Sequence, residues 1–183
     1  MKVLILNGAR NPKGQTATAA EALADGVREA GGEAEHVMLP TLAIERCRQC
    51  NDDGWGLCRA EGRCVIEDDF ASLADRLAEA DAAVFATPVY FSDLSESLRA
   101  LLDRLRRICM HEVGKARVQG TPAVGVCVAG GGGGGAPECT MHLTKIVSRC
   151  GFDCIDMVPV RRQNLQAKLP LLAQTGTWLA GGR

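Results

Sequence analysis

KVLILNGARNPKGQTATAAEALADGV, residues 2–27, sets the architecture of this 183-residue chain. Its first part, Lys2–Asn7, is a continuous apolar run that ends at Gly8, which is typical of a strand buried on both faces. Its second part, from Gln15 to about Ala30, is an Ala-rich segment with helical spacing, and Gly31-Gly32 would end that helix. A buried strand followed by a helix favours a parallel sheet covered by helices.

The same alternation continues along the chain. Further strands are predicted at Glu35–Leu39, Ala82–Ala86, Pro122–Ala129 and Asp153–Val160. Further helices are predicted near Asp68–Ala80 and at Ser95–Ile108, Pro137–Cys150 and Gln163–Leu179. Five strands alternating with five helices predict one α/β domain with helices on both faces of a parallel sheet. In such sheets ligands bind outside the carboxyl ends of the strands.

Composition narrows the classes of function. The net charge of −1 implies no broad attraction to nucleic acid or to membranes. No run of eighteen apolar residues occurs, and the N-terminal apolar run is too short for a signal peptide, so we expect a cytoplasmic protein without a membrane span. Nine cysteines in such a protein indicate reduced thiols. Those in apolar segments are expected to pack as small hydrophobic residues: Cys109, Cys127, Cys150 and Cys154.

The loop Gly8–Thr16, after the first strand, carries groups that suit a phosphate. Besides backbone N–H groups at a helix N-terminus, its side-chain donors are Arg10, Lys13, Gln15, Thr16 and Thr18. Such a terminus favours anions. Because Lys13 precedes Gly14, the Gly-Lys-Ser/Thr order of a triphosphate-binding loop is not met. We predict a phosphate site; the alternative is an ordinary turn with Thr16 as the helix cap.

Two further loops follow strands and should reach the same edge of the sheet. After the third strand, Thr87-Pro88-Val89 leads to the adjacent aromatics Tyr90 and Phe91, in a chain with 4% aromatic residues. These rings suggest an apolar wall for a flat ligand, the alternative being packing on a helix or a second subunit. After the fourth strand, the run Gly130–Gly135 would allow close backbone approach to a cofactor, or would be a flexible loop.

A dense cysteine segment, CRQCNDDGWGLCRAEGRC, occupies residues 47–64. Its members are Cys47, Cys50, Cys58 and Cys64. In a reducing compartment such a set of thiols usually binds a metal or a cluster, or does redox work. Redox chemistry is therefore the leading functional theme.

The order of three motifs resembles that of the NAD(P)H-dependent FMN reductase and iron–sulfur flavoprotein family of the flavodoxin-like superfamily. The motifs are NGARNPKGQT, then C-x2-C…C-x5-C-VIEDDF, then ATPVYFSDLSESLRALLDR. The resemblance covers roughly Lys2 to Arg104 well and the remainder loosely. It implies a single flavodoxin-like domain over residues 1–183, a three-layer sandwich whose sheet has the strand order 2-1-3-4-5. The Cys-rich loop at about residues 45–66 would be an insertion.

The resemblance also implies FMN as the cofactor and assigns its contacts. The phosphate would lie at Ala9, Arg10, Lys13, Gln15, Thr16 and Thr18. The ring would lie at Pro88, Val89, Tyr90, Phe91 and Ser92, with its other edge near Gly130, Gly131 and Gly132. Ala9 stands where the family has a serine, so one hydroxyl donor is lost here, and Arg10 or Lys13 would have to compensate.

For the four cysteines the resemblance implies a [4Fe–4S] cluster, bound by Cys47, Cys50, Cys58 and Cys64. The spacing C-x2-C-x7-C-x5-C departs from the family's C-x2-C-x2-C-x5-C by five extra residues before Cys58. Two alternatives stay open. The cysteines could bind no metal, or they could bind zinc, for which only one of the two usual C-x2-C pairs is present.

The implied function is transfer of a hydride from NAD(P)H to FMN, followed by transfer to free flavin, a quinone or a protein acceptor. We predict no catalytic side chain, because the cofactor carries the chemistry; His36, His111 and His142 are interpreted as structural or surface residues. A homodimer or homotetramer is expected. The alternatives are a flavodoxin-type electron carrier, a zinc- or thiol-based redox sensor, and a dinucleotide-binding dehydrogenase built on the glycine run, whose G-x-G-x-x-G match is weak.

Overall fold

The structure is a computed structural model, and it describes residues 1–181. The strands are β1 Lys2–Asn7, β2 Glu33–Met38, β3 Ala82–Pro88, β4 Pro122–Ala129 and β5 Asp153–Arg161. The longer helices are α1 Gln15–Glu29, α3 Phe70–Glu79, α4 Glu96–Ile108, α6 Ala136–Cys150 and α7 Leu165–Ala180. Short helical turns are η1 Leu39–Thr41, α2 Leu57–Ala60, α5 Glu112–Ala116 and η2 Arg162–Asn164.

The strands form one parallel sheet in the order β2-β1-β3-β4-β5. β1, β3 and β4 are the three inner strands of the sheet. Every residue of β4 is buried, and so are all but one residue of β1 and of β3, as expected for strands covered on both faces. The predicted parallel sheet and its 2-1-3-4-5 order are therefore confirmed.

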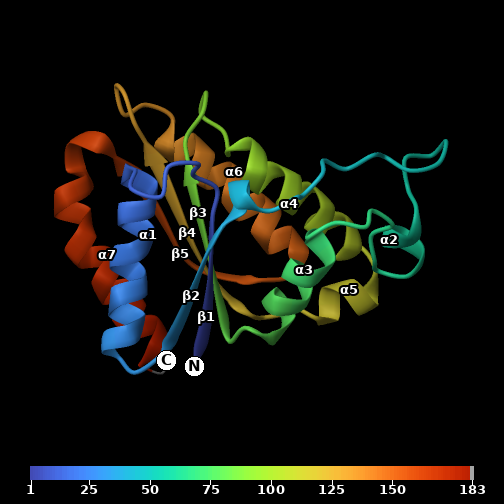
Figure 1. Cartoon of the computed structure of the whole chain (residues 1–183), viewed down its shortest axis with the longest axis horizontal. Coiled ribbons are helices and arrows are strands. Elements are labelled where there is room, and N and C mark those ends of the chain that lie inside the picture. Colours follow the sequence, from blue (N-terminus) through green and yellow to red (C-terminus); the bar gives the residue numbers. More distant parts are fainter. Residues whose placement is uncertain (182–183) are drawn as a thin grey trace.

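Helices cover both faces of the sheet (Figure 1), with α1 and α7 on one side and α3, α4 and α6 on the other. Alternate strand residues feed the two cores. Val3 and Ile5 pack with α1 and α7, whereas Leu4 and Leu6 pack with α3 and α4. This period of two follows from the pleat of a strand and makes a three-layer sandwich.

The predicted boundaries hold within about two residues, and the differences have simple causes. β2 begins at Glu33 because it pairs with β1 from Lys2 onward. The last helix begins at Leu165 because residues 162–164 form a 3₁₀ turn first. The short helices α2 and α5 were not predicted, since four or five residues are too few to carry a helical apolar period.

Most cysteines outside residues 47–64 pack in the core as predicted. Cys109, Cys127 and Cys150 are buried, as is Cys139. Cys154 is only partly buried, and its Sγ lies 3.2 Å from Ser148 Oγ. None of the helices described here combines the length and the apolar character that a membrane crossing needs.

Candidate functional site

A cavity of about 800 Å³ lies at the carboxyl ends of the strands, where the loops after β1, β3 and β4 meet. All three loops rise from the same edge of the sheet in Figure 1. The volume falls within the range of small-molecule and cofactor sites. The position follows from topology, because parallel strands present all their carboxyl ends at one edge.

One end of this cavity lies at the start of α1. Gly14 is the N-cap and has no side chain to cap the helix, so Thr16 is not the cap, contrary to the alternative considered above. Arg10, which is exposed, Gln15 and Thr16 line the same end. No carboxylate lines the cavity within residues 1–181. Uncapped N–H groups beside a cation are suited to a phosphate.

The first loop is fixed from both sides. Asn7, fully buried, accepts the N–H of Ala9 at 2.9 Å, and the N–H of Gly8 donates to Ala86 O at 2.8 Å. Ser97 Oγ donates to Gly8 O at 3.1 Å. A Cβ at Gly8 would lie 2.2 Å from Ser95 Oγ, so only glycine lets the loop lie against the start of α4.

The loop that carries Tyr90 and Phe91 is a tight hairpin. Tyr90 and Asp93 exchange two backbone hydrogen bonds, of 3.0 and 2.9 Å. Between them, Phe91 and Ser92 both adopt left-handed backbone conformations, at φ of 49° and 64°. That geometry fits a two-residue hairpin turn but is costly for residues other than glycine. Phe91 is fully exposed and the Tyr90 ring is half exposed, so the cavity has aromatic groups at its mouth.

Asp93 holds this hairpin to α4 and α6. Its carboxylate pairs with Arg99 and lies 3.3 Å from His142 Nδ1. Burial raises the pKa of Asp93, but the N–H of Leu94, the Arg99 charge and His142 outweigh burial, so the pKa lies below its usual value. The loop is therefore anchored by an ionised carboxylate.

The glycine loop forms a further wall of the cavity and meets the aromatic hairpin at Gly135. Gly133 N donates to Gly130 O at 2.7 Å, and the Gly132 carbonyl accepts from Arg161 at 3.3 Å and from Gln163 at 3.2 Å. The run is thus tied to the end of β5. Gly135 has φ of 80°, and a Cβ there would lie 2.6 Å from Ser92 Oγ.

The structure brings most of the predicted FMN residues into this one cavity. Those that line it are Ala9, Arg10, Gln15, Thr16, Pro88, Val89, Tyr90, Phe91, Gly130, Gly131 and Gly132. Lys13, Thr18 and Ser92 are not among the lining residues. Thr18 Oγ1 donates to Gly14 O inside the helix, and Ser92 lies against Gly135.

Sequence reasoning did not single out five further lining residues. They are Asn11, Gly14, Val128, Ala129 and Gly134. Asn11 Oδ1 accepts the N–H of Lys13 at 3.0 Å, and its carbonyl accepts the N–H of Gly14, so it shapes the turn. The dipeptide Asn11-Pro12 is a turn signal that could have identified it.

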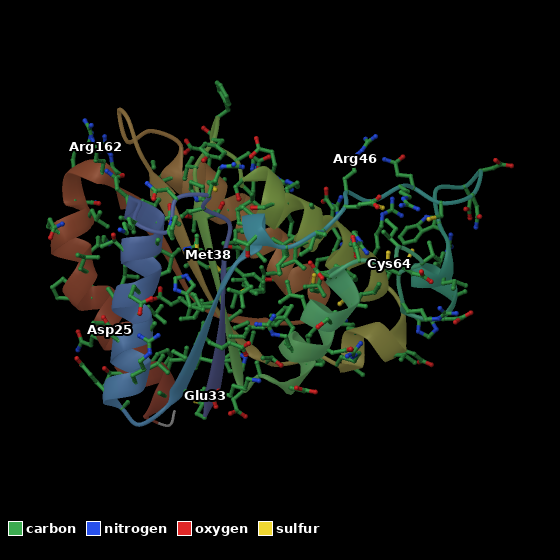
Figure 2. The ribbon with its side chains drawn as sticks, viewed as in Figure 1. Asp25, Glu33, Met38, Arg46, Cys64 and Arg162 are labelled. Carbon is green, nitrogen blue, oxygen red and sulfur yellow. The ribbon has the colours of Figure 1, made fainter. Side chains whose placement is uncertain are left out.

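The four clustered cysteines line a second, much smaller cavity of about 20 Å³, between the loop before α2 and the C-terminal half of α4. Figure 2 labels Cys64 in this region, away from the strand-end loops. Within the described chain no three His, Cys, Asp or Glu side chains are placed to hold a single metal ion.

Arg104 clamps the neck of this cysteine loop. Its side chain is 1% exposed and pairs with Asp68, which is 6% exposed, through contacts of 2.6 and 2.9 Å. The same guanidinium donates to Glu45 O at 3.1 Å and to Ile66 O at 3.3 Å, the two ends of the loop. It also lies 4.2 Å from the Phe70 ring centre. Although it carries a charge, Arg104 is therefore an internal residue.

Arg107 holds the tip of the cysteine loop. Its guanidinium donates to Gly54 O at 2.8 Å and lies 4.6 Å from the Trp55 ring centre. Beyond it, a cavity of about 600 Å³ between α4 and α6 is lined by the cations Arg106, Arg107, Lys145 and Arg149 together with Trp55, Met110 and Ile146. A strongly basic groove therefore adjoins the cysteines.

α4 connects the two cavities. Ser95 and Ser97, at its start, contact the first loop, while Arg104 and Arg107 line the cysteine cavity. Nine residues separate Ser95 from Arg104, which corresponds to about 13 Å along a helix axis.

Comparison with known proteins agrees with this arrangement. The family model described as "NADPH-dependent FMN reductase" matches residues 1–168. An iron–sulfur flavoprotein of Methanocaldococcus jannaschii is 32% identical over 131 residues, which is 72% of this chain and 65% of that protein. The chain thus matches somewhat less than two thirds of that relative's length.

Solved structures agree in fold. An NAD(P)H:quinone oxidoreductase from Methanothermobacter marburgensis superposes with a TM-score of 0.72 at 22% identity, covering 100% of this chain and 98% of that one. An archaeal flavodoxin gives a TM-score of 0.62 at 14% identity, covering 98% of this chain and 96% of that one. The flavodoxin-like fold is confirmed. With a family match over residues 1–168, the chain belongs to the NADPH-dependent FMN reductase family.

Proposed function

We propose that this protein binds FMN in the strand-end cavity and oxidises NAD(P)H, passing the electrons to free flavin, a quinone or a protein acceptor. The observation that carries the proposal is the single cavity of about 800 Å³ lined by all three loops that the sequence assigned to FMN. Family membership supports the same conclusion. When bound, FMN would supply a flavin that accepts a hydride.

The residues present fit FMN in chemistry as well as in space. The phosphate would lie at the start of α1, where Gly14 leaves the helix N–H groups free of a side-chain cap and Arg10 supplies a positive charge. A flat ring would lie between the Tyr90–Phe91 hairpin and the glycine run, which exposes backbone and has no side chains to obstruct it. Ala9 adds no hydroxyl, so Arg10 is the principal charged donor.

The chain's own side chains bind and orient rather than transfer protons. Within the described residues no histidine or carboxylate lines the cavity. Hydride transfer needs alignment of two rings more than it needs an acid or base. The strained hairpin at Tyr90–Asp93, closed by two backbone hydrogen bonds, would fix one wall of the cavity. The flavin and nicotinamide rings would align against that wall.

Binding of flavin tests the proposal most directly. Protein freed of ligand should quench FMN fluorescence on titration and should bind riboflavin more weakly, since riboflavin lacks the phosphate. The same preparation with FMN should oxidise NADH or NADPH when a quinone is added. Failure to bind FMN would refute the assignment of the cavity, and binding without turnover would favour the second candidate below.

For the cysteines we propose a [4Fe–4S] cluster as an electron relay between FMN and the acceptor. All four thiols line one cavity, which is the donor set that such a cluster uses, and a relative at 32% identity is an iron–sulfur flavoprotein. The present cavity of about 20 Å³ holds little more than one water molecule, so a cluster would have to displace the side chains that fill it.

Anaerobic reconstitution with iron and sulfide tests the cluster. Iron and acid-labile sulfide should be retained by the wild-type chain and lost in Cys58→Ser, while Cys154→Ser, outside the loop, should retain both. Equal retention in all three would exclude the four cysteines as ligands. Zinc retention without sulfide would favour the sensor alternative.

A protein acceptor would be expected to approach the basic groove beside the cysteines. Arg106, Arg107, Lys145 and Arg149 line it, although the whole chain has a net charge of −1. An acidic surface would be attracted there, and its binding would weaken with salt. The cytoplasmic location and the homodimer or homotetramer stay predictions, which fractionation of cells and light scattering would test.

The second candidate function is electron carriage with little reductase turnover. The archaeal flavodoxin neighbour shows that the fold suits either role, and fold alone does not choose between them. The nearly neutral charge disfavours the carrier, because such carriers are commonly acidic for docking. Steady-state oxidation of NAD(P)H with added quinone separates the two candidates.

A further inference from the structure

We infer that Asn7 and His36 are positioning residues for the Gly8–Thr16 loop, and that the Asn7 contact with Ala9 requires a His36 ring whose proton is on Nδ1 and whose Nε2 accepts. Neither residue lines the FMN cavity. The inference rests on the proposed function only in naming FMN as the anion. The tautomer and the loop contact are properties of the protein alone.

The orientation of the Asn7 amide follows from its neighbours. Asn7 is the last residue of β1 and is fully buried. One of its terminal atoms lies 2.9 Å from the N–H of Ala9, and a backbone N–H requires an acceptor. That atom must be Oδ1. The amide nitrogen Nδ2, which only donates, therefore faces the other way, 3.1 Å from His36 Nε2.

The state of His36 follows in turn. A nitrogen that faces an NH₂ group must accept, so Nε2 carries no proton. The remaining ring nitrogen, Nδ1, lies 3.0 Å from Glu21 Oε2 and must carry the proton that it donates. The chain of bonds thus runs from Glu21 on α1 through His36 on β2 to Asn7 on β1, and then to Ala9 in the loop. Each donor direction is fixed by the step before it.

Groups from α1, β1 and α7 lie near the His36 ring. From α1, Glu21 faces the ring directly, and Arg28 pairs with both Glu21 at 2.6 Å and Asp25 at 2.9 Å. A hydrogen bond from Arg28 and one from His36 lower the pKa of Glu21, so it is ionised. From β1, the Asn7 amide faces Nε2, and from α7 Leu169 lines the adjoining cavity. The ionised Glu21 carboxylate accepts the Nδ1 proton, and the Asn7 amide donates to Nε2.

The His36 ring lies outside the FMN cavity, so it can be replaced without changing that cavity's lining. Its side chain is 16% exposed and lines a separate cavity of about 600 Å³ together with Asp25 and Met38, which Figure 2 labels. A ring whose Nε2 carried the proton would place that N–H against the Asn7 NH₂ group. If the amide rotated to accept it, Ala9 would lose its acceptor. The Gly8 and Ser97 contacts would remain, so the loop would loosen at Ala9 alone.

The first test needs no flavin. Long-range ¹⁵N–¹H spectra of the protein at pH 8 should show a His36 ring with the proton on Nδ1, assigned by loss of the signals in His36→Gln. Amide exchange at Ala9 should be slow at pH 8 relative to an unstructured loop and should be less protected in His36→Phe, which offers the Asn7 NH₂ group no acceptor. An Nε2–H tautomer, or protection at Ala9 that is the same in His36→Phe, would overturn the inference.

The second test uses FMN affinity. Gln at position 36 offers an oxygen to the Asn7 NH₂ group, whereas Phe offers no acceptor. His36→Gln should therefore bind FMN nearly as tightly as the wild type. His36→Phe should bind it roughly fivefold more weakly, the effect of one lost hydrogen bond.

His111→Phe is the matched control, since His111 caps α5 far from the loop, and it should bind FMN as the wild type does. Equal FMN affinity of His36→Phe and the wild type would refute the inference while leaving FMN binding intact. A protein that binds no FMN at any pH would refute the proposed function, and the tautomer and Ala9 measurements would still decide this inference.

Discussion

Replacing Arg104 by Met should be among the most destabilising single changes in this chain. Arg104 and Asp68 are 1% and 6% exposed and form a two-pronged ion pair, with contacts of 2.6 and 2.9 Å. Removing one partner of a buried pair leaves a buried charge and costs about 3–5 kcal/mol. For a chain of this length that corresponds to a fall in Tm of roughly 6–20 °C.

Urea denaturation measures the change, and Arg117→Met provides the control. Arg117 pairs with Asp75 at 2.5 Å on the surface, with side chains 37% and 63% exposed, so losing it should cost less than about 1 kcal/mol. The double variant Arg104→Met with Asp68→Leu should recover much of the lost stability, because it removes the orphaned charge. If Arg104→Met cost no more than Arg117→Met, the assignment of a buried clamp would be wrong.

The same variant should change the response to acid. Burial raises the pKa of Asp68, but the Arg104 hydrogen bonds and the N–H groups of Glu45 and Phe70 outweigh burial, so its pKa in the folded state is lowered. The stability from this pair is therefore present above the unfolded pKa of about 4 and is lost as the pH falls through the lower folded value. The difference in stability between wild type and Arg104→Met should narrow below about pH 4. A constant difference down to pH 2 would contradict the reasoning.

Three other predictions concern the strand-end cavity. Arg10→Gln should weaken FMN binding severalfold to tenfold and leave riboflavin binding unchanged, as measured by fluorescence titration. Lys115→Gln is the control for loss of an exposed cation. Equal loss of affinity for both flavins would contradict a phosphate contact. Gly135→Ala should lower the free energy of unfolding by about 1–3 kcal/mol, because φ is 80° and the new Cβ would lie 2.6 Å from Ser92 Oγ; unchanged stability would show that the hairpin can move aside. Phe91→Ser should leave the free energy of unfolding of the monomer within about 0.5 kcal/mol of the wild type, since the ring is fully exposed. It should weaken flavin binding or subunit association. No effect on either would contradict a role for the ring in flavin binding or association.

The sequence located the cofactor loops because they are local features at strand ends. An apolar run followed by glycine and helical spacing predicted β1 and α1 at Gln15, and the sheet order put Gly8, Pro88 and Gly130 at one edge. Those predictions depended on short-range pattern and on topology, which a single sequence carries. They did not depend on any particular side-chain contact.

The sequence by itself determined the alternation of strands and helices, the grouping of loops at one edge and the density of thiols, because burial on two faces and chain reversal leave periodic marks. Only the tertiary structure decided that Arg104 is internal rather than solvated, since its partner Asp68 lies 36 residues away and charged residues leave no burial pattern. It likewise decided that His36, read as a structural or surface residue, bonds Asn7 across 29 positions. Hydrogen bonds between distant residues depend on packing in three dimensions, and a pattern along one dimension does not specify them.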